Sequence, residues 1–218
     1  ASSVSPLSIV LSFLNRFRSS AVPLISLLAF ASPSATVRAD VMGFNNLNPA
    51  DWKYNQSDNS SPADSPNPDT IHITNLHAEE ARSIFHNTPQ PVSSRFMVAF
   101  TYEAQNARVF GCDYGAPFTM QHDARGSQAV GGTGGNLGYG GIANSVAVTV
   151  QLTRNASGFF SASTFGAASP SVSPISWISG HPIHVTLTYD GNILSETIVD
   201  AVTLATRQRN FIVGDLAL

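Results

Sequence analysis

Two pairs of adjacent titratable residues are the first candidates for catalytic chemistry in this sequence. His122 and Asp123 stand beside a glycine-rich segment and have the residue types of an acid–base pair. Because they directly follow a predicted strand, we expect them to form a structural turn. Glu79 and Glu80 are paired carboxylates, but neighbouring residues on a strand point to opposite faces and cannot flank one bond. We expect both glutamates to be solvated.

Histidine and cysteine do not have the spacing of a metal site. His181 and His184 lie three residues apart at the start of a predicted strand, which places them on opposite faces. Cys112 is the single cysteine, so no disulfide can form within the chain and no cysteine cluster can hold zinc. We expect Cys112 to be a small buried apolar residue.

The composition limits the partners and the number of domains. The 218 residues carry a formal net charge of −3, and only 11% of them are charged. No run of Lys or Arg is present, so the attraction to phosphate backbones that nucleic-acid binding needs is missing. With 43% hydrophobic residues, the chain can form one domain with a substantial core. We expect no nucleic-acid partner.

The sequence pattern of residues 1–39 predicts that this segment is a secretory leader. Arg16 and Arg18 precede an uncharged apolar stretch at 21–31, which is too short to cross a hydrocarbon core of about 30 Å as a helix. Small residues follow as far as Ala39, as at a cleavage site, so the mature domain is predicted to span 40–218. The mature chain is then secreted or at the cell surface and has no membrane span. The alternative, a buried helix of the domain, has to accommodate three prolines: Pro6, Pro23 and Pro33.

Alternation of apolar and polar residues predicts strands along most of the mature chain. Residues 51–69 are rich in Asn, Ser, Pro and Asp and are predicted to form a surface loop. Asp190-Gly191-Asn192 is predicted to be a hairpin turn. Because no segment after the leader is convincingly helical, the predicted fold class is all-β, an antiparallel β-sandwich. The predicted strands are 71–74, 95–102, 118–121, 145–152, 183–189 and 194–199.

A glycine-rich segment at 131–142 lies between two of these strands. Glycine-rich loops bind phosphate groups where a helix follows, because the helix N-terminus supplies free N–H donors. Here the next element is the strand predicted at 145–152, so phosphate-loop and dinucleotide-binding functions are excluded by the context.

The central block of the chain closely resembles that of the legume-type (L-type) lectins. The block runs from Phe118-Thr-Met-Gln-His-Asp-Ala-Arg-Gly126 through 131–142 to Asn144-Ser-Val-Ala-Val148. Segments on either side, at 81–91 and 186–198, are similar to bacterial secreted members, and the resemblance extends from Gly43 to the C-terminus. It implies a concanavalin A-like jelly roll with a flat and a curved sheet. It also implies a shallow sugar site in the loops at the curved face.

The resemblance implies five sugar-binding residues. In metal-dependent members, an Asp in a first loop, a glycine amide in a second, and an aromatic residue and an Asn in a third hold the hydroxyls and the apolar face of one sugar. Direct alignment of the first loop places Tyr114 where the Asp is expected, and a shift of one residue places Asp113 there. The glycine corresponds to Gly131 or Gly132, and the third-loop asparagine to Asn155. The expected partner is a glycan or polysaccharide.

The chain departs from the family at its metal site and at its C-terminal end. Metal-binding members carry Glu and Asp two residues apart after Val-Ala-Val, where this sequence has Thr149 and Gln151. Because calcium needs carboxylates among its oxygen ligands, we expect no calcium–manganese pair and no cofactor. The family also continues into another core strand. Since this chain ends at Leu218, it is either truncated or leaves a core strand position unfilled.

Three functions follow as hypotheses. The resemblance favours carbohydrate binding by a secreted module, metal-independent or weak, without enzymatic activity. The changed metal residues leave a non-binding structural or adhesion module as the alternative. A glycoside hydrolase needs two carboxylates on one sheet face, and no predicted strand presents such a pair from Glu79, Glu80, Glu103 and Glu196. We expect the aromatic side chains of Trp177, Phe159 and Phe160 to lie in the core rather than in a sugar-stacking platform.

Overall fold

The structure is a computed structural model, and it is described here for residues 8–12, 43–44, 47–57, 64–74, 80–90, 95–105, 115–161, 169–214 and 216. Its first six strands are β1 (Ser8–Ser12), β2 (Trp52–Gln56), β3 (Asp64–Asn67), β4 (Thr70–His72), β5 (Arg82–His86) and β6 (Phe96–Gln105). The other six are β7 (Gly115–Gln121), β8 (Ser145–Gln151), β9 (Ala156–Ser161), β10 (Ile183–Tyr189), β11 (Ile193–Asp200) and β12 (Thr206–Ile212). Two short 3-10 helices, η2 (Gly126–Gln128) and η3 (Gly134–Asn136), lie between β7 and β8.

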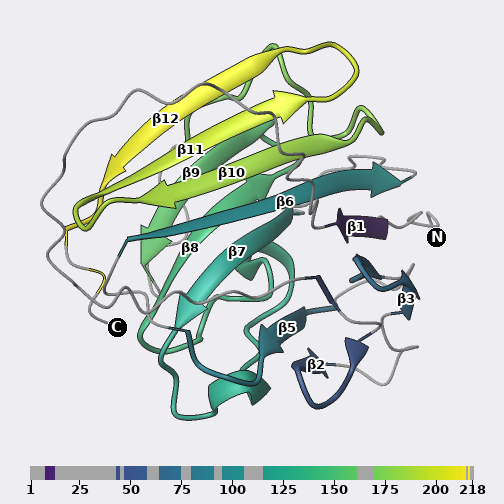
Figure 1. Cartoon of the computed structure of the whole chain (residues 1–218), viewed down its shortest axis with the longest axis vertical. Helices are drawn as coiled ribbons and strands as arrows, with labels where there is room; N and C mark the ends of the chain where they lie inside the picture. Colours follow the sequence, from purple (N-terminus) through teal and green to yellow (C-terminus); the bar gives the residue numbers. More distant parts are fainter. Residues whose placement is uncertain are drawn as a thin grey trace, which may run out of the picture.

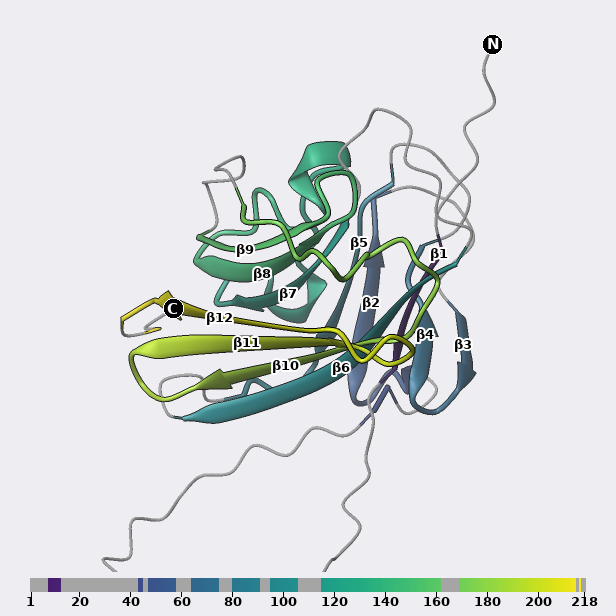
Figure 2. The same ribbon diagram turned by 90° about the horizontal axis from the view of Figure 1, so that it is seen from above.

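These strands form two layers of antiparallel sheet (Figure 1). One layer is a seven-stranded sheet with the order β12-β11-β10-β6-β1-β4-β3. The three-stranded sheet β7-β8-β9 faces it, and the two-stranded sheet β2-β5 lies beside β7 (Figure 2). The predicted all-β antiparallel sandwich is confirmed.

The main core lies between the seven-stranded and the three-stranded sheets. Val185 and Leu187 of β10 face it, and the same period of two places Val146, Val148 and Val150 of β8 opposite them. Burying one such side chain stabilises a fold by roughly 1.5–3 kcal/mol. Every residue of β8 is buried, because its other face is covered by the glycine-rich loop. The strand that carries Thr149 and Gln151 is therefore closed to solvent on both faces.

The predicted hairpin at Asp190-Gly191-Asn192 is confirmed. β10 and β11 pair from Ile183↔Asp200 to Tyr189↔Leu194. The Asp190 carboxylate accepts the backbone N–H groups of Asn192 at 2.9 Å and Ile193 at 2.8 Å, and Gly191 adopts a φ of +105°. These contacts fix the register, so that Glu196 lies on the same inward face as Leu194 and Ile198.

The prediction of a surface loop at 51–69 was wrong, because β2 and β3 lie inside it. β2 pairs with β5 from Trp52↔His86 to Gln56↔Arg82. Trp52 is buried, and its ring lies 5.1 Å from that of Phe44. A strand whose apolar content is concentrated in Trp52 and Tyr54 has the composition of a loop, and its pairing with β5 decides its structure.

The backbone of β1 lies between β6 and β4, with Val10 opposite both Glu103 and His72. β1 belongs to the segment predicted as a leader, so cleavage near Asp40 would remove this strand from the sheet. The leader and the mature domain at 40–218 stay predictions. Within the described residues, no helix has the length and apolar character needed to cross a membrane.

Candidate functional site

The start of β7 and the end of β8 lie side by side. Their register pairs Gly115 with Gln151, and Asn155 stands in the turn that follows β8. The glycine-rich loop returns to this same end, since a Cβ atom on Gly115 would lie 3.2 Å from Leu137 Cδ2. The predicted site residues Asp113 and Tyr114 precede β7 directly and lie outside the described residues.

The glycine-rich loop is held closed by its own backbone. The N–H of Gly131 donates to Gly138 O at 2.9 Å, and the N–H of Gly132 donates to Gly140 O at 2.8 Å. A Cβ atom on Gly131 would lie 2.5 Å from the Tyr139 carbonyl carbon, so the loop strands approach too closely for any side chain there. The amides predicted to donate to a sugar are thus already engaged within the loop.

Asp123 anchors both ends of this loop. Its carboxylate accepts the Arg125 N–H, Nε and Nη2 groups at 2.8–2.9 Å and the Ala143 N–H at 2.7 Å. The hydrogen bonds from Arg125 hold the pKa of Asp123 well below its usual range. Arg125 in turn donates to Val130 O and Gly141 O. The predicted structural role of His122-Asp123 is confirmed, and Arg125 is the partner that the sequence analysis missed.

Asn155 fastens a distant segment to the β8–β9 turn. Its Nδ2 donates to Ile175 O at 2.8 Å, and its Oδ1 accepts the Trp177 N–H at 3.1 Å. Its φ of +46° is in the left-handed region, which asparagine tolerates better than most residues. Within the described residues, Nδ2 donates this one side-chain hydrogen bond, and the amide carries a second N–H. The side chain predicted to bind sugar therefore has a structural role as well.

Thr149 and Gln151, the two positions considered for metal-ligating carboxylates in the sequence, form a buried neutral cluster. Gln151 Nε2 donates to Thr149 Oγ1 at 3.0 Å and to Ser169 Oγ at 2.8 Å, and Thr149 Oγ1 donates to Gly158 O at 3.2 Å. The two side chains are neutral, the amide of Gln151 donates to the threonine hydroxyl, and the cluster supplies no carboxylate for a hard cation. These residues do not fit a calcium–manganese pair. In the part of the chain that the structure describes, no group of three or more His, Cys, Asp or Glu side chains is placed to hold a metal ion.

The carboxylates considered for glycoside hydrolysis point to opposite faces of the seven-stranded sheet. Glu196 is 2% exposed and lies between the two layers, where its Oε1 accepts a hydrogen bond from Ser157 Oγ at 2.6 Å. Glu103 is on β6 between the core residues Tyr102 and Ala104, so it faces outward. Two carboxylates on opposite faces cannot flank one glycosidic bond.

Burial raises the pKa of Glu196, although the hydrogen bond from Ser157 and the charge of Arg209 on β12 favour the ionised form. Because the pKa is raised in the folded state, the protonated carboxyl contributes to the stability of the fold. This contribution is fully present below the ordinary pKa of 4.5 and is lost as the pH rises through the folded-state pKa. Glu196→Gln cannot ionise. We therefore expect its free energy of unfolding, relative to that of the unaltered protein, to increase as the pH rises from 4 to 8.

Urea unfolding across this pH range measures the effect, with Glu103→Gln as the control for loss of one carboxylate on the outer face. A difference between Glu196→Gln and the unaltered protein that stays constant with pH would contradict a raised pKa for the buried Glu196 carboxyl.

Glu80 was expected to be solvated, and this was wrong. Its carboxylate lies 2.8 Å from Arg82 Nη2, and the two side chains are 9% and 1% exposed. The burial of Arg82 on β5 requires a carboxylate beside it. Glu79 lies outside the described residues, as does Cys112.

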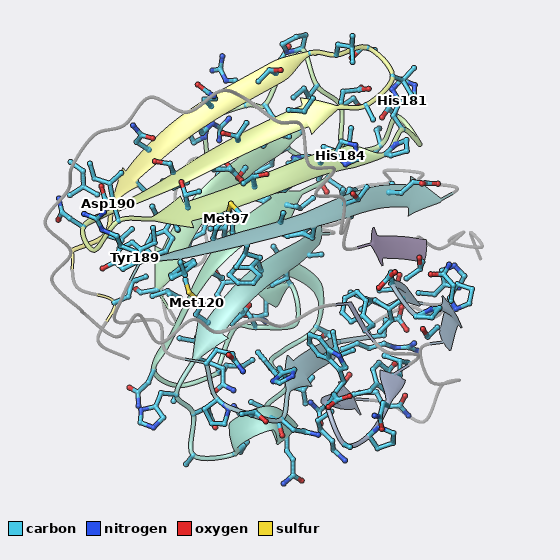
Figure 3. The ribbon with its side chains drawn as sticks, viewed as in Figure 1. Met97, Met120, His181, His184, Tyr189 and Asp190 are labelled. Carbon is cyan, nitrogen blue, oxygen red and sulfur yellow. The ribbon has the colours of Figure 1, made fainter. Side chains whose placement is uncertain are left out.

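His181 and His184 bind different partners at one end of the seven-stranded sheet (Figure 3). His181 Nδ1 lies 2.9 Å from the Asp200 carboxylate, and His184 Nδ1 lies 2.8 Å from Thr101 Oγ1. Burial alone would raise the pKa of Asp200, but hydrogen bonds from Thr203, His181 and Val202 outweigh it and lower the pKa to about 2. Both histidines therefore support the strand ends.

The aromatic residues considered as a sugar-stacking platform lie in the core, as predicted. Trp177 is buried, its ring lies 5.6 Å from that of Tyr102 in an edge-on arrangement, and its Nε1 donates to Ala156 O. Phe160 is buried beneath the glycine-rich loop, and Phe159 packs on Phe211 with ring centroids 5.9 Å apart.

Three solved lectins have a similar structure. The chain matches basic winged bean lectin with Tn-antigen at a TM-score of 0.61 and 16% identity, over 75% of each chain. It matches the lectin from Bauhinia forficata in complex with GalNAc at a TM-score of 0.59 and 18% identity, over 77% of this chain and 79% of the lectin. It matches winged bean acidic lectin complexed with methyl-alpha-D-galactose at a TM-score of 0.60 and 16% identity, over 76% of this chain and 77% of the lectin. No protein-family model matches the chain. The fold is the legume lectin-like β-sandwich.

Proposed function

We propose that this protein is a carbohydrate-binding module that works without a metal ion. The observation that carries the proposal is the Gly115↔Gln151 register, which gathers the start of β7, the turn at Asn155 and the returning glycine-rich loop at one end of the three-stranded sheet. The similar lectins carry Tn-antigen, GalNAc and methyl-alpha-D-galactose. The ligand proposed here is accordingly a galactose-type sugar, with the protein secreted or at the cell surface and without enzymatic activity.

The geometry favours weak binding. The amides of Gly131 and Gly132 are engaged within the loop, and Asn155 Nδ2 already donates to Ile175 O. The hydrogen bonds of Thr149 and Gln151 keep β8 and its turn in place without metal. A Kd on the order of 1 mM, or about −4 kcal/mol, is expected for one sugar.

Thermal unfolding in the presence of methyl α-galactoside or N-acetylgalactosamine tests this proposal. At a sugar concentration of about 100 times Kd, bound sugar stabilises the folded state by about 2.7 kcal/mol. Mannitol at the same concentration controls for osmolyte effects. EDTA is expected to leave the shift unchanged, and Asp113→Ala is expected to remove it. A folded protein that shows neither a shift nor a signal on a glycan array would contradict the proposal.

The second candidate is a structural or adhesion module that binds no sugar, and the engaged side chain of Asn155 favours it. Under both candidates, Asn155→Ala leaves Ile175 O and the Trp177 N–H without partners and costs about 1–3 kcal/mol. Only the sugar-dependent shift of the unaltered protein separates the two functions.

A further inference from the structure

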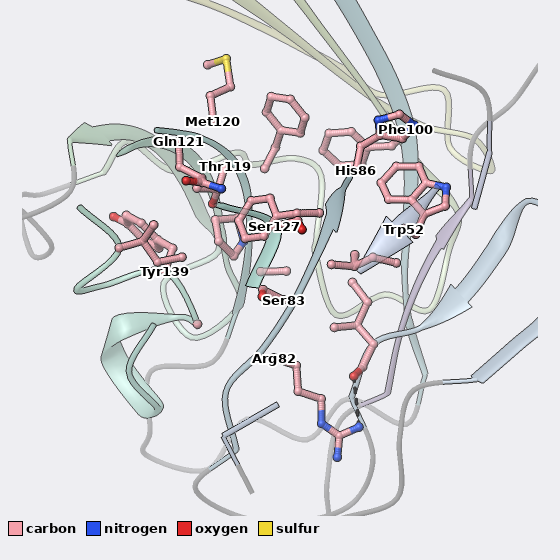
Figure 4. Close-up of a pocket in the computed structure, with 18 of the residues that line it drawn as sticks. Trp52, Arg82, Ser83, His86, Phe100, Thr119, Met120, Gln121, Ser127 and Tyr139 are labelled. Carbon is pink, nitrogen blue, oxygen red and sulfur yellow. Dashed lines mark hydrogen bonds between the residues drawn. The ribbon is translucent and has the colours of Figure 1, made fainter. Parts of the chain in front are cut away.

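A cavity of about 700 Å³ lies between β5 and β7. All residues of these two strands line it, and its floor is formed by β6, including Phe96, Val98 and Phe100. Figure 4 shows Thr119, Met120 and Gln121 of β7 on one side of this space and Trp52, His86 and Phe100 on the other. We call this space the β5–β7 groove.

The two sheets that flank the groove belong to one layer. One apolar cluster beneath the glycine-rich loop contains Ala147 and Phe160 from the three-stranded sheet and Phe85 from β5. The segment just before this loop accepts hydrogen bonds from Asn55 of β2, to Ser127 O at 2.8 Å, and from Ser83 of β5, to Ala129 O. Both ribbon views show the order β9-β8-β7-β5-β2 (Figures 1 and 2). Among the described strands, β7 pairs only with β8 and β5 only with β2.

The β7 edge retains hydrogen-bonding groups on the groove side. A proline is tolerated in a strand where its missing N–H lies on the unpaired edge, so Pro117 identifies the edge that faces the groove. Thr119 and Gln121 have the same orientation, because backbone groups alternate with a period of two. Their N–H groups and the carbonyl of Pro117 are therefore presented to an occupant.

The lining of the groove is mostly apolar. Phe96, Val98 and Phe118 face the main core but are only partly buried, so the core extends into the groove. The charged groups at its margin are already paired, Glu80 with Arg82 and Asp123 with Arg125, each at 2.8 Å. An occupant thus needs apolar side chains on both faces and carries no charge.

We propose that the β5–β7 groove binds an extended, uncharged and mostly apolar segment of a partner polypeptide, which adds to β7 as a strand and joins the two small sheets. A polypeptide backbone is the ligand that presents donors and acceptors at strand spacing along both sides. The five residues of β5 and the seven of β7 set the length of the segment, about 17–23 Å at roughly 3.3 Å per residue. The groove runs along β7 and reaches the proposed sugar site at Gly115 and Leu137, which line both.

A synthetic peptide tests the proposal: acetyl-Val-Thr-Val-Thr-Phe-Thr-Val-Lys-Lys-amide, whose lysines confer solubility. The matched control replaces each threonine by proline, which keeps the charge and apolar side chains but removes backbone donors. We expect saturable 1:1 binding of the first peptide and at least tenfold weaker binding of the control. Hydrogen exchange is expected to slow at Thr119, Gln121 and β5, and to stay unchanged on β12, the free edge of the seven-stranded sheet.

Thr119→Pro removes one further donor from the groove edge and is expected to weaken binding about tenfold. The exchange measurement on the unaltered protein stands independently of whether this variant folds. Equal affinity of the two peptides would show an unspecific apolar pocket and overturn strand binding. If the peptide slowed hydrogen exchange on β12 as much as on β7, it would be binding to any exposed strand edge. This result would also overturn the proposal of a specific groove. Full protection of Thr119 and Gln121 without peptide would show that the protein's own chain occupies the groove, which excludes a partner.

Discussion

Trp177→Ala is expected to destabilise the protein by about 3–5 kcal/mol, a large part of the stability of an average domain. The Trp177 side chain is 1% exposed, packs edge-on against Tyr102 at 5.6 Å, and donates from Nε1 to Ala156 O at 3.0 Å. Its removal leaves a cavity between the layers and a buried carbonyl without a partner. Urea unfolding followed by circular dichroism measures the loss, because one of the two tryptophans is removed in this variant.

The neighbouring residue supplies the control. Ile178 is 40% exposed, and Ile178→Ala is expected to change the free energy of unfolding by about 0.5 kcal/mol. A loss below 1 kcal/mol for Trp177→Ala, together with loss of the sugar-dependent thermal shift, would instead support the sugar-stacking platform. The pair of variants therefore distinguishes a core residue from a binding residue at adjacent positions.

Strands with strict alternation could be predicted from the sequence. β10 lies at the predicted positions Ile183–Tyr189, and its burial alternates along the whole strand. The alternation in β11 also indicated that Glu196 shares the face of Leu194 and Ile198, so its burial could have been inferred. By contrast, β12 is an edge strand with mostly exposed polar residues, and no pattern in its sequence predicts it.

The side-chain contacts of the candidate site could not be predicted, because they join residues far apart in the chain. Asn155 bonds to Ile175 and Trp177, about twenty positions away, and Ser157 bonds to Glu196 across the two layers. The family resemblance implied which residues surround a sugar. Whether their amides and carbonyls are already engaged depends on how the loops pack, and local sequence does not carry that information.

Gly131→Ala is expected to destabilise the protein by about 3 kcal/mol and to open the glycine-rich loop. Its Cβ atom would lie 2.5–2.7 Å from the Tyr139 Cα and carbonyl carbon and from Gly140 O, all backbone atoms that a rotamer change cannot move. Relief requires breaking the hydrogen bond from the Gly131 N–H to Gly138 O, so the loop separates along this pair. Urea unfolding and hydrogen exchange at Gly131 and Tyr139 measure the two effects.

Gly134→Ala separates steric crowding from backbone conformation in the same loop. Gly134 has a φ of +57°, and a Cβ atom there would meet nothing within 4 Å, so about 1–2 kcal/mol of conformational strain is its whole expected cost. Since Ala147 and Phe160 are covered by this loop, Gly131→Ala is also expected to expose part of the three-stranded sheet and to reduce sugar binding more than Gly134→Ala. Equal costs for the two variants would mean that the loop tolerates a side chain at Gly131. In that case the close approach of the backbone at Gly131 would not be what holds the glycine-rich loop in place beside the proposed sugar site.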